Sequence, residues 1–365
     1  MEHIIGISKF KNINNVTCYM NSILVILQQS PLFCDYMVSG KFKTLLDKNK
    51  YNQDNFNDLI SYQIHKLFKV SLTLENAIIT PSSLRYVCTK KDFSWGEQTQ
   101  QDSCEFIQFL ISNIEEEIGM KVEILTGLNI NKKYKLYSVD VSIDSIISTF
   151  DYYNFIKKEF SPIKTLFTGL EETKTYCSVC GNKKNNNQTF SILQLPIPVE
   201  DSIETIDIYK CLDKWSEKET LDNMNRMTCD FCGVKSNIIR QNYIYKTPKI
   251  LIIQLKRFKR DMCGMVSSKI NNKVNYPVLD LDISNYISNS SPSKINSINS
   301  RYNLFGINIH LDFENIECGH YISIVKNRFD NNWYLFNDEK DPIQINKEHQ
   351  IINKKAYMLF YYRID

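Results

Sequence analysis

The first third of the chain carries apolar residues at helical spacing. They recur every three to four positions in residues 18–30, 59–68 and 104–118, which is the pattern of helices that bury one face. Thr17 can cap the first of these helices, and Pro31 ends it. The pattern therefore predicts that the first third of the chain is mostly helical.

Beyond about residue 134 the pattern becomes that of β-strands. Residues 250–255 form a run that is apolar except at Gln254, as expected of a strand that is buried on both faces. Alternating or short apolar runs predict further strands at residues 134–139, 190–195, 302–310, 321–326, 333–336 and 356–362. A helical first third followed by many strands predicts an α+β fold.

Composition limits the class of protein. The chain has 365 residues and is 43% hydrophobic, which is enough for a packed core and argues against wholesale disorder. The net charge is only +3, and Lys and Arg are scattered, so a nucleic-acid partner is not expected. No apolar run reaches the roughly 18 residues that cross a bilayer, and no signal-peptide pattern opens the chain. We expect a monomer in the cytoplasm or nucleus, with no membrane partner.

The cysteines suggest metal binding rather than disulfides. Their number is odd, eleven, in a long chain without secretory signals. Two Cys-x-x-Cys-Gly motifs supply Cys177 and Cys180, and Cys229 and Cys232. Each glycine permits a tight turn, and four thiolates with no fifth ligand describe a closed structural Zn²⁺ site. The alternatives are four unpaired cysteines or a redox pair.

A nucleophile and a base can also be assigned. Cys18 lies at the first turn of the predicted helix 18–30, where the helix dipole and free N–H groups favour thiolate over thiol. His320 lies between Gly319 and Tyr321 at the start of a predicted strand. An imidazole beside the thiol could take its proton and later protonate a leaving amine. The alternatives are a small buried cysteine and an ordinary surface or core histidine.

Two polar residues follow the strand predicted at 333–336. Asn337 or Asp338 could accept a hydrogen bond from the distal N–H of the imidazole and so fix its tautomer. Taken alone, an Asn-Asp pair after a strand is only a turn signal.

These motifs, in this order, resemble those of the ubiquitin-specific protease family, and the resemblance covers essentially the whole chain. The matching segments are Thr17–Ser22, Gln100–Phe106, the two cysteine motifs, Leu255–Phe258 with Tyr276-Pro277 and Leu279–Leu281, Gly319–Tyr321, and Phe336–Asp338. Each segment is modest evidence by itself, whereas the ordered set is specific.

The resemblance implies a single catalytic domain over residues 1–365 with a papain-like fold. It implies a helical thumb at about 1–130, a β-rich palm at about 131–164 and 251–365, and zinc-ribbon fingers at about 165–250. Within the palm, residues 284–300 are rich in Ser and Asn, so we predict a mobile surface insertion there.

The resemblance also implies catalytic roles. Cys18 would be the nucleophile, His320 the base, and Asn337 the third residue, with Asp338 polarising or ordering the site. The family usually has an Asn five positions before the nucleophile, but that position here is Ile13. A one-residue insertion would let Asn12 serve as the oxyanion-hole donor, which is our expectation, and Asn14 is the alternative.

The resemblance places the substrate-binding residues along a channel for the C-terminal tail of ubiquitin. That tail carries two arginines and ends in Gly-Gly, so a narrow acidic channel fits it. Gln100, Asp102 and Glu105 would lie along the channel, with Asp102 and Glu105 on one helix face. Tyr321 could pack against the terminal glycines. The alternatives are a solvated helix face and a core tyrosine.

The expected function is a thiol-dependent deubiquitinase that cleaves after the C-terminal Gly of ubiquitin and acts on ubiquitinated proteins. Three rivals remain open. The chain could be an inactive relative that only binds ubiquitin, because the oxyanion segment is irregular. It could act on another ubiquitin-like modifier. It could be a zinc-ribbon nucleic-acid binder, although Lys183-Lys184 is too small a basic patch for that.

Overall fold

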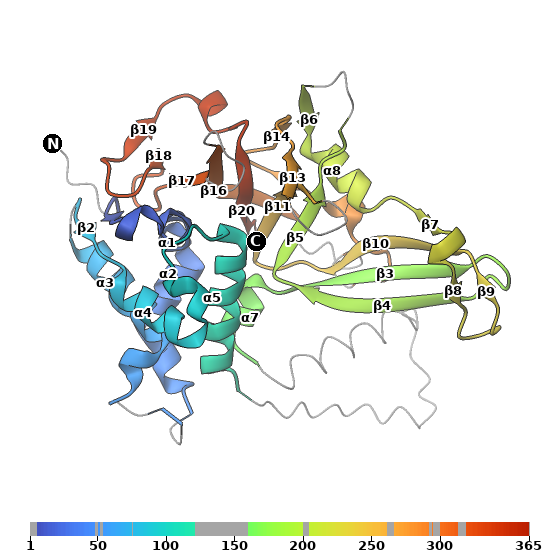
Figure 1. The fold of residues 1–365 in the computed structure, drawn as a ribbon, viewed down its shortest axis with the longest axis horizontal. Coiled ribbons are helices and arrows are strands. Elements are labelled where there is room, and N and C mark those ends of the chain that lie inside the picture. The colour runs from blue at the N-terminus through green and yellow to red at the C-terminus, as the bar shows by residue number, and fades with distance from the viewer. Residues whose placement is uncertain are drawn as a thin grey trace.

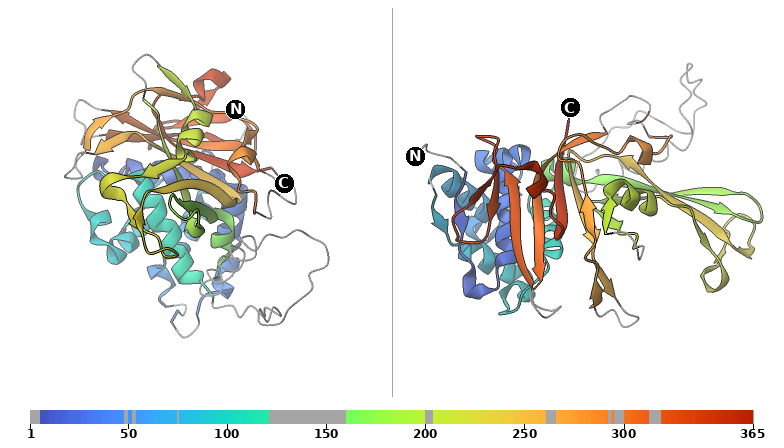
Figure 2. Two further views of the ribbon diagram at one scale, coloured as in Figure 1. Left: turned by 90° about the vertical axis from the view of Figure 1, so that its right-hand side faces the viewer. Right: turned by 90° about the horizontal axis from the view of Figure 1, so that it is seen from above.

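The computed structural model confirms the predicted α+β class. It describes residues 6–47, 50–51, 54–74, 76–120, 160–199, 204–260, 266–291, 294, 300–312 and 319–364. The strand predicted at 134–139 lies outside these residues. Helices occupy one side of the molecule, a large sheet lies beside them, and a long arm extends from the sheet (Figures 1 and 2).

Three helices match the predicted ones: α1 (Cys18–Gln29), α3 (Ile60–Thr73) and α5 (Ser103–Ile118), of which α3 extends five residues beyond its expected end. The other helices on this side are α2 (Pro31–Ser39), α4 (Ser82–Lys91) and the short α7 (Pro162–Phe167), for which no bounds were predicted. Pro31 ends α1 and also opens α2, whose first turn is capped by the Ser30 hydroxyl. Every residue of α1 is buried, so this helix lies at the centre of the molecule rather than on its surface.

Strands from the second half of the chain build the main sheet. Among the described residues its order is β19-β18-β17-β16-β20-β11-β5, with β15 also paired to β16. Only β5 and β11 run parallel within this order. The bounds are β5 (Ile192–Pro196), β11 (Ile250–Lys256), β15 (Leu281–Asp282), β16 (Arg301–Asp312), β17 (Gly319–Lys326), β18 (Trp333–Phe336), β19 (Ile343–Ile345) and β20 (Ala356–Arg363).

The main sheet is buried on both faces. Ile250 and Ile252 of β11 pack into the core shared with the helices, while Leu251 and Ile253 pack into a second core on the opposite face. This confirms the prediction from the apolar run. On the helix side, a Cβ at Gly306 would lie 2.6 Å from a methyl carbon of Ile26. Glycine therefore lets α1 pack directly against β16.

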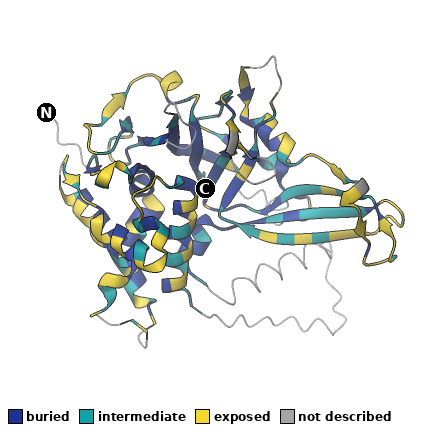
Figure 3. Cartoon of the chain, in the orientation of Figure 1, coloured by how far each residue is buried: buried dark blue, intermediate teal, exposed yellow. Residues whose placement is uncertain are grey.

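A second sheet forms the arm, in the region where the resemblance implies the fingers, but the apolar pattern predicted none of its strands. Its order is β4-β3-β10-β7, with bounds β3 (Gly169–Cys177), β4 (Lys183–Phe190), β7 (Glu219–Leu221) and β10 (Ile238–Lys246). Its residues are largely half-buried or exposed, in contrast to the main sheet (Figure 3). Long polar segments such as Lys183–Phe190 gave no apolar alternation from which to predict these strands.

Short elements complete the described structure. A parallel pair joins β1 (Lys9–Phe10) to β2 (Ile78–Ile79). The others are β6 (Thr205–Asp207), α8 (Ile208–Trp215), β8 (Met227–Thr228), β9 (Lys235–Ser236), β12 (Phe258–Arg260), β13 (Val266–Lys269) and β14 (Lys273–Asn275).

The predicted mobile surface insertion at 284–300 is wrong for residues 284–291. Tyr286, Ser288 and Ser291 are buried. The Ser288 hydroxyl donates to the Glu172 carboxylate, which is fully buried on β3, and the Ser291 hydroxyl donates to the Tyr245 carbonyl. Serine here satisfies buried acceptors instead of marking a solvated loop. Residues 292–293 and 295–299 lie outside the described residues.

Candidate active site

Cys18 is the first residue of α1, and the segment before it is built from asparagine and threonine. Asn14 and Asn15 adopt positive φ angles of 53° and 58°, a conformation that asparagine tolerates better than most residues. Thr17 is the N-cap residue, as predicted, but its hydroxyl accepts from the Ile13 N–H at 2.8 Å. It does not cap α1 itself, so first-turn N–H groups remain for the sulfur.

The thiol is fully buried, and its pKa differs from the prediction. Burial raises the pKa of Cys18 to about 11, and the nearby Asp338 carboxylate adds to the increase. Hydrogen bonds from the backbone N–H groups of Tyr321 and of the first turn of α1 oppose it. The expected helix effect is therefore present, but desolvation outweighs it. The predicted lowering of the pKa is wrong for this resting state, in which Cys18 is a thiol at neutral pH.

This resting state has a measurable consequence. Because the folded-state pKa is raised, the thiolate fraction is small at pH 7 and grows about tenfold per pH unit towards pH 11. Alkylation of Cys18 by iodoacetamide in the free protein should rise accordingly between pH 7 and pH 10. The rate is followed by mass spectrometry of the peptide that contains Cys18. A rate that levels off below pH 7 would show a preformed thiolate and contradict this description.

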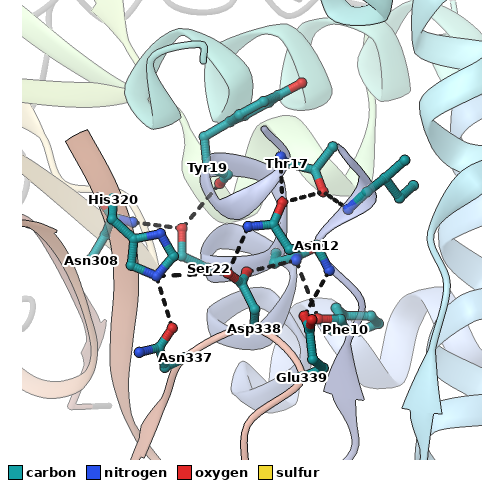
Figure 4. A network of polar contacts seen from close by, with 12 residues as sticks. Phe10, Asn12, Thr17, Tyr19, Ser22, Asn308, His320, Asn337, Asp338 and Glu339 are labelled. Carbon is teal, nitrogen blue, oxygen red and sulfur yellow. Dashed lines mark hydrogen bonds and ion pairs between the residues drawn. The ribbon is translucent and has the colours of Figure 1, made fainter. Parts of the chain in front are cut away.

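The structure brings His320 to the same place. His320 lies on β17 directly before Tyr321, whose backbone N–H acts on the sulfur of Cys18 and lowers its pKa. Its Nε2 lies 2.8 Å from Oδ1 of Asn337 and 3.7 Å from Oδ2 of Asp338 (Figure 4). Since an amide oxygen can only accept, Nε2 carries the proton in this contact and Nδ1 is the basic nitrogen.

Asp338 connects this pair to the segment before Cys18. Its Oδ2 accepts from Nδ2 of Asn12 at 2.8 Å, and its Oδ1 accepts from Nδ2 of Asn21 at 2.8 Å (Figure 4 labels Asn12 and Asp338). Asn12 also accepts the Thr17 N–H at 2.8 Å through its amide oxygen. Asn12 is thus part of the site, as expected, whereas the alternative, Asn14, bonds outward to Gln98.

All four predicted substrate-binding residues line one cavity. It has a volume of about 660 Å³, and its wall includes Gln100, Asp102, Glu105 and Tyr321. Its wall also includes Gly319 and Tyr321, the two residues that flank His320. The cavity therefore lies beside the strand end that carries His320.

The expected arrangement of the two acidic residues is partly wrong. Asp102 is the N-cap of α5, so it does not share a helix face with Glu105. Its carboxylate accepts the N–H groups of Cys104 and Glu105 and, at 2.8 Å, the hydroxyl of Tyr357. Glu105 is exposed in the cavity wall. The carboxylate of Asp102 thus shapes the cavity, and the side chain of Glu105 faces its opening.

Gln100 and His310 shape the end of the cavity. Gln100 accepts the Gly319 N–H at 2.8 Å and so holds the strand end that carries His320. His310 on β16 lies beside Gly319, where an added Cβ would be only 1.9 Å from Nε2 of His310. Glycine is therefore required at position 319 for close packing of these two strands, which gives the Gly-His-Tyr motif a steric reason.

A second cavity continues towards the arm. It has a volume of about 560 Å³ and shares Gln108, Gln194 and Lys256 with the first. Its wall also includes Trp215 and Asn242 near the base of the arm. The two cavities therefore adjoin, and together they are called the groove below.

The four predicted metal ligands meet at the tip of the arm. The Sγ atoms of Cys177, Cys180, Cys229 and Cys232 all lie within 4.8 Å of one another and could hold a metal ion. In each motif the glycine has a positive φ, 68° at Gly181 and 70° at Gly233, and its N–H donates to the carbonyl of the first cysteine. The prediction that each glycine permits the tight turn is confirmed.

Hydrogen bonds within this cluster change the pKa values of its thiols. Hydrogen bonds from the Cys180 N–H, the Ser236 hydroxyl and the Val179 N–H lower the pKa of Cys177. The hydrogen bond from the Asn182 N–H lowers the pKa of Cys180, but burial and hydrogen bonds to the other three thiols raise it to about 12. Since thiolate is the form that binds metals, the turn favours the ligand state at Cys177 and not at Cys180.

Comparison with known proteins identifies the family. The family model described as "Ubiquitin carboxyl-terminal hydrolase" matches residues 8–361. The chain belongs to this family. The family resemblance and the fold predicted from the motifs are confirmed.

Within the described residues, no helix is both long and apolar enough to cross a membrane.

Several relatives carry the family name. "Ubiquitin carboxyl-terminal hydrolase Usp2" of Drosophila melanogaster is 27% identical over 98% of this chain, which spans 35% of that protein. "Probable ubiquitin carboxyl-terminal hydrolase R319" of Acanthamoeba polyphaga mimivirus is 27% identical over 99% of this chain and 91% of that protein. The chain thus spans about a third of the first relative and most of the second.

A solved structure shares the fold. The "SAGA Ubp8/Sgf11/Sus1/Sgf73 DUB module bound to ubiquitin aldehyde" superposes with a TM-score of 0.71 at 25% identity. The superposition covers all of this chain and 71% of that one.

Three residues that contact the site were not predicted from the sequence. Asn21 bonds to Asp338, His310 packs on Gly319, and Tyr357 bonds to Asp102. The matching segment Thr17–Ser22 includes Asn21, but its partner lies 317 residues later. Only the fold brings the two together.

Proposed function

We propose that this chain is a thiol-dependent deubiquitinase that hydrolyses the isopeptide or peptide bond after the C-terminal Gly of ubiquitin. One observation carries the proposal: a groove lies beside the strand end that carries His320, and the backbone N–H of the next residue, Tyr321, acts on the sulfur of Cys18 and lowers its pKa. The names of the family and of its relatives support the same substrate.

The chemistry we propose uses Cys18 and His320 as nucleophile and base. Nδ1 of His320 takes the thiol proton as the sulfur attacks the carbonyl carbon. The imidazolium then protonates the leaving lysine amine, and a thioester remains. A water activated by His320 hydrolyses the thioester and restores the thiol. Because the resting thiol is covered, entry of the substrate must expose it. General base catalysis of this kind contributes roughly 10²–10⁴-fold.

Asn337 and Asp338 would stabilise the imidazole during these steps. The 2.8 Å contact from Nε2 of His320 to Asn337 supports a role in holding the tautomer. The Asp338 carboxylate, 3.7 Å from the same nitrogen, would favour the imidazolium that forms after attack.

The oxyanion would be held by the backbone N–H of Cys18 and by the side chain of Asn12. One N–H of the Asn12 amide donates to Asp338, and the amide oxygen accepts from Thr17. The second N–H of that amide is the proposed donor to the oxyanion. A donor of this kind is worth roughly 10²–10³-fold in rate.

We further propose that the metal at the tip of the arm is a structural zinc ion. The sulfur pairs Cys177–Cys232 and Cys180–Cys229 are 3.9 Å and 3.8 Å apart. Four thiolates at about 2.3 Å from one tetrahedral zinc would be about 3.8 Å apart. No catalytic step requires the metal, whose role is to fold the tip.

The arm, main sheet and helices would act as fingers, palm and thumb, with the bounds given by the resemblance. In this view the body of ubiquitin rests against the arm and its tail enters the groove.

The related SAGA structure is a complex with other subunits. We therefore propose that this chain acts with partner proteins rather than as a lone monomer. A cytoplasmic or nuclear location remains a proposal.

The acidic side chain in the groove gives a test of the tail position. Glu105→Arg places a positive charge where the ubiquitin tail carries arginines, so kcat/KM should fall roughly tenfold through KM, with kcat little changed. The matched control is Glu116→Arg, an exposed residue of the same helix that does not line the groove. Equal kinetics for the two variants would place the tail elsewhere.

The proposed function is tested with a panel of modifiers. Purified protein is incubated with C-terminal fluorogenic substrates and vinyl-sulfone probes of ubiquitin and of other ubiquitin-like proteins. We expect cleavage and labelling with ubiquitin and neither with the others. Binding of ubiquitin without labelling would support the inactive relative. Labelling by another modifier alone would support the second rival.

A further inference from the structure

We propose that Asn21 is a positioning residue that clamps Asp338 and thereby aligns the oxyanion donor Asn12 with the His320–Asn337 pair. The inference rests on the proposed function and deepens it. Asn21 belongs to α1, one turn after Cys18, and is 2% exposed. It touches neither the groove nor the imidazole in the described contacts.

The clamp consists of two amides on one carboxylate. Nδ2 of Asn21 donates to Oδ1 of Asp338 at 2.8 Å and to the Phe10 carbonyl at 3.2 Å. Nδ2 of Asn12 donates to Oδ2 of Asp338 at 2.8 Å. The carboxylate is thus held from two sides by the nucleophile helix and by the segment that precedes it.

The buried amide of Asn21 carries an energetic penalty, which indicates that the hydrogen bonds from its Nδ2 have a role. Its Oδ1 is buried and has no hydrogen-bond partner among the described residues. An unsatisfied buried acceptor is unfavourable. An apolar side chain at this position would avoid the penalty but would leave Asp338 without its second donor.

The position of Asp338 determines that of both neighbouring groups. Asp338 has a left-handed φ of 50°, and its neighbour Asn337 accepts from His320. The other end of the Asn12 amide is fixed by the Thr17 N–H. Movement of the Asp338 carboxylate would therefore disturb the imidazole contact and the oxyanion donor together.

Electrostatics makes the clamp sensitive to pH. Burial raises the pKa of Asp338, and the hydrogen bond from Asn21 is the largest of the effects that lower it. The other groups that act on it are His320 and Asn12, which also lower the pKa, and Glu339, which raises it. The thiol of Cys18 faces it as well. Loss of Asn21 would therefore let Asp338 protonate at a higher pH.

The test compares two buried asparagines: Asn21, which belongs to α1, and Asn308, which contacts α1 through Ser22. Asn21→Ala removes the clamp. Asn308→Ala removes an amide that donates to the Ser22 hydroxyl at 2.9 Å and accepts from Ser103 at 2.8 Å, whereas neither bond involves Asp338. Both residues are buried, so both variants should lose thermal stability. Steady-state kinetics on a ubiquitin fluorogenic substrate are recorded against pH.

For Asn21→Ala we expect kcat to fall roughly 10–100-fold with KM nearly unchanged, the loss associated with a hydrogen bond to a charged group. The acid limb of the pH profile should move to higher pH. Asn308→Ala should keep the wild-type kcat and profile. Equal losses in the two variants, or an unshifted acid limb in Asn21→Ala, would overturn the proposal and leave Asn21 a packing residue.

A second measurement separates this inference from the proposed function. Crystal structures of the two variants show the position of Asp338 without any substrate. We expect the 337–338 turn and the Asn12 amide to move in Asn21→Ala and to stay in place in Asn308→Ala. An unmoved turn in Asn21→Ala refutes the clamp even if the enzyme cleaves ubiquitin. Failure of the wild type to cleave ubiquitin refutes the proposed function instead.

Discussion

Replacement of Cys18 by alanine is expected to abolish turnover of a ubiquitin C-terminal fluorogenic substrate while leaving the fold intact. In the proposed mechanism the thioester forms on Cys18, so the rate should fall by roughly 10⁴–10⁶-fold, as when the nucleophile of a triad is removed. The substitution removes one buried sulfur atom and no hydrogen bond of the clamp. Affinity for ubiquitin, measured calorimetrically, should therefore be retained.

The control for this variant is a second buried cysteine. Cys34 lies on α2, is fully buried and takes part in none of the contacts described for the site. Cys34→Ala should cost stability of a similar size and leave kcat unchanged. Measurable turnover by Cys18→Ala, or loss of turnover by Cys34→Ala, would contradict the assignment of the nucleophile.

Replacement of Cys229 by serine is expected to unfold the tip of the arm. Structural zinc sites carry about 10–16 kcal/mol of apparent binding energy, which is folding energy for the segments that hold the metal. Only a small apolar cluster supports the tip: Cys177, Cys229 and Ile238, with Leu221 and Cys232 packed against it. Zinc content should fall from about one ion to none per chain, and hydrogen exchange should rise across β3, β4 and β10.

The effect of metal loss on catalysis should depend on where the metal site lies relative to Cys18. The metal ligands lie at the far end of the arm from the helices that carry Cys18 (Figure 1). Loss of the metal should therefore raise KM for ubiquitin more than it lowers kcat. Cys211→Ser is the matched control, because Cys211 is buried in α8 outside the cluster. Zinc absent from the purified active wild type, or lost equally from Cys211→Ser, would contradict the site.

Much of the fold could be predicted because its signals are local. The helices from residues 18 to 118 show apolar spacing, and β11 shows the apolar run of a strand buried on both faces. The arm could not be predicted in this way. Its strands are half-exposed and polar, so their register depends on pairing between β3, β4 and β10 rather than on burial.

In the candidate site, too, the residues with local sequence signals could be predicted and the contacts that depend on the fold could not. Cys18, His320 and the four cysteines were identified from motifs whose chemistry is local. The helix-face position of Asp102 was misjudged because its carboxylate caps α5. The burial of Ser288, in the segment predicted as a surface insertion, could not be predicted because its partner, Glu172, lies more than one hundred residues away in the chain. The raised pKa of Cys18 reflects burial, which depends on the whole fold and cannot be read from the helix start alone.

One measurement tests the central claim most directly. The wild-type protein is reacted with a ubiquitin vinyl-sulfone probe and analysed by intact-protein mass spectrometry, and the modified peptide is then sequenced. We predict a single adduct of one ubiquitin, located on Cys18, and none after His320→Ala on the same timescale. An adduct on any other cysteine, or no adduct with the wild type, would contradict the account.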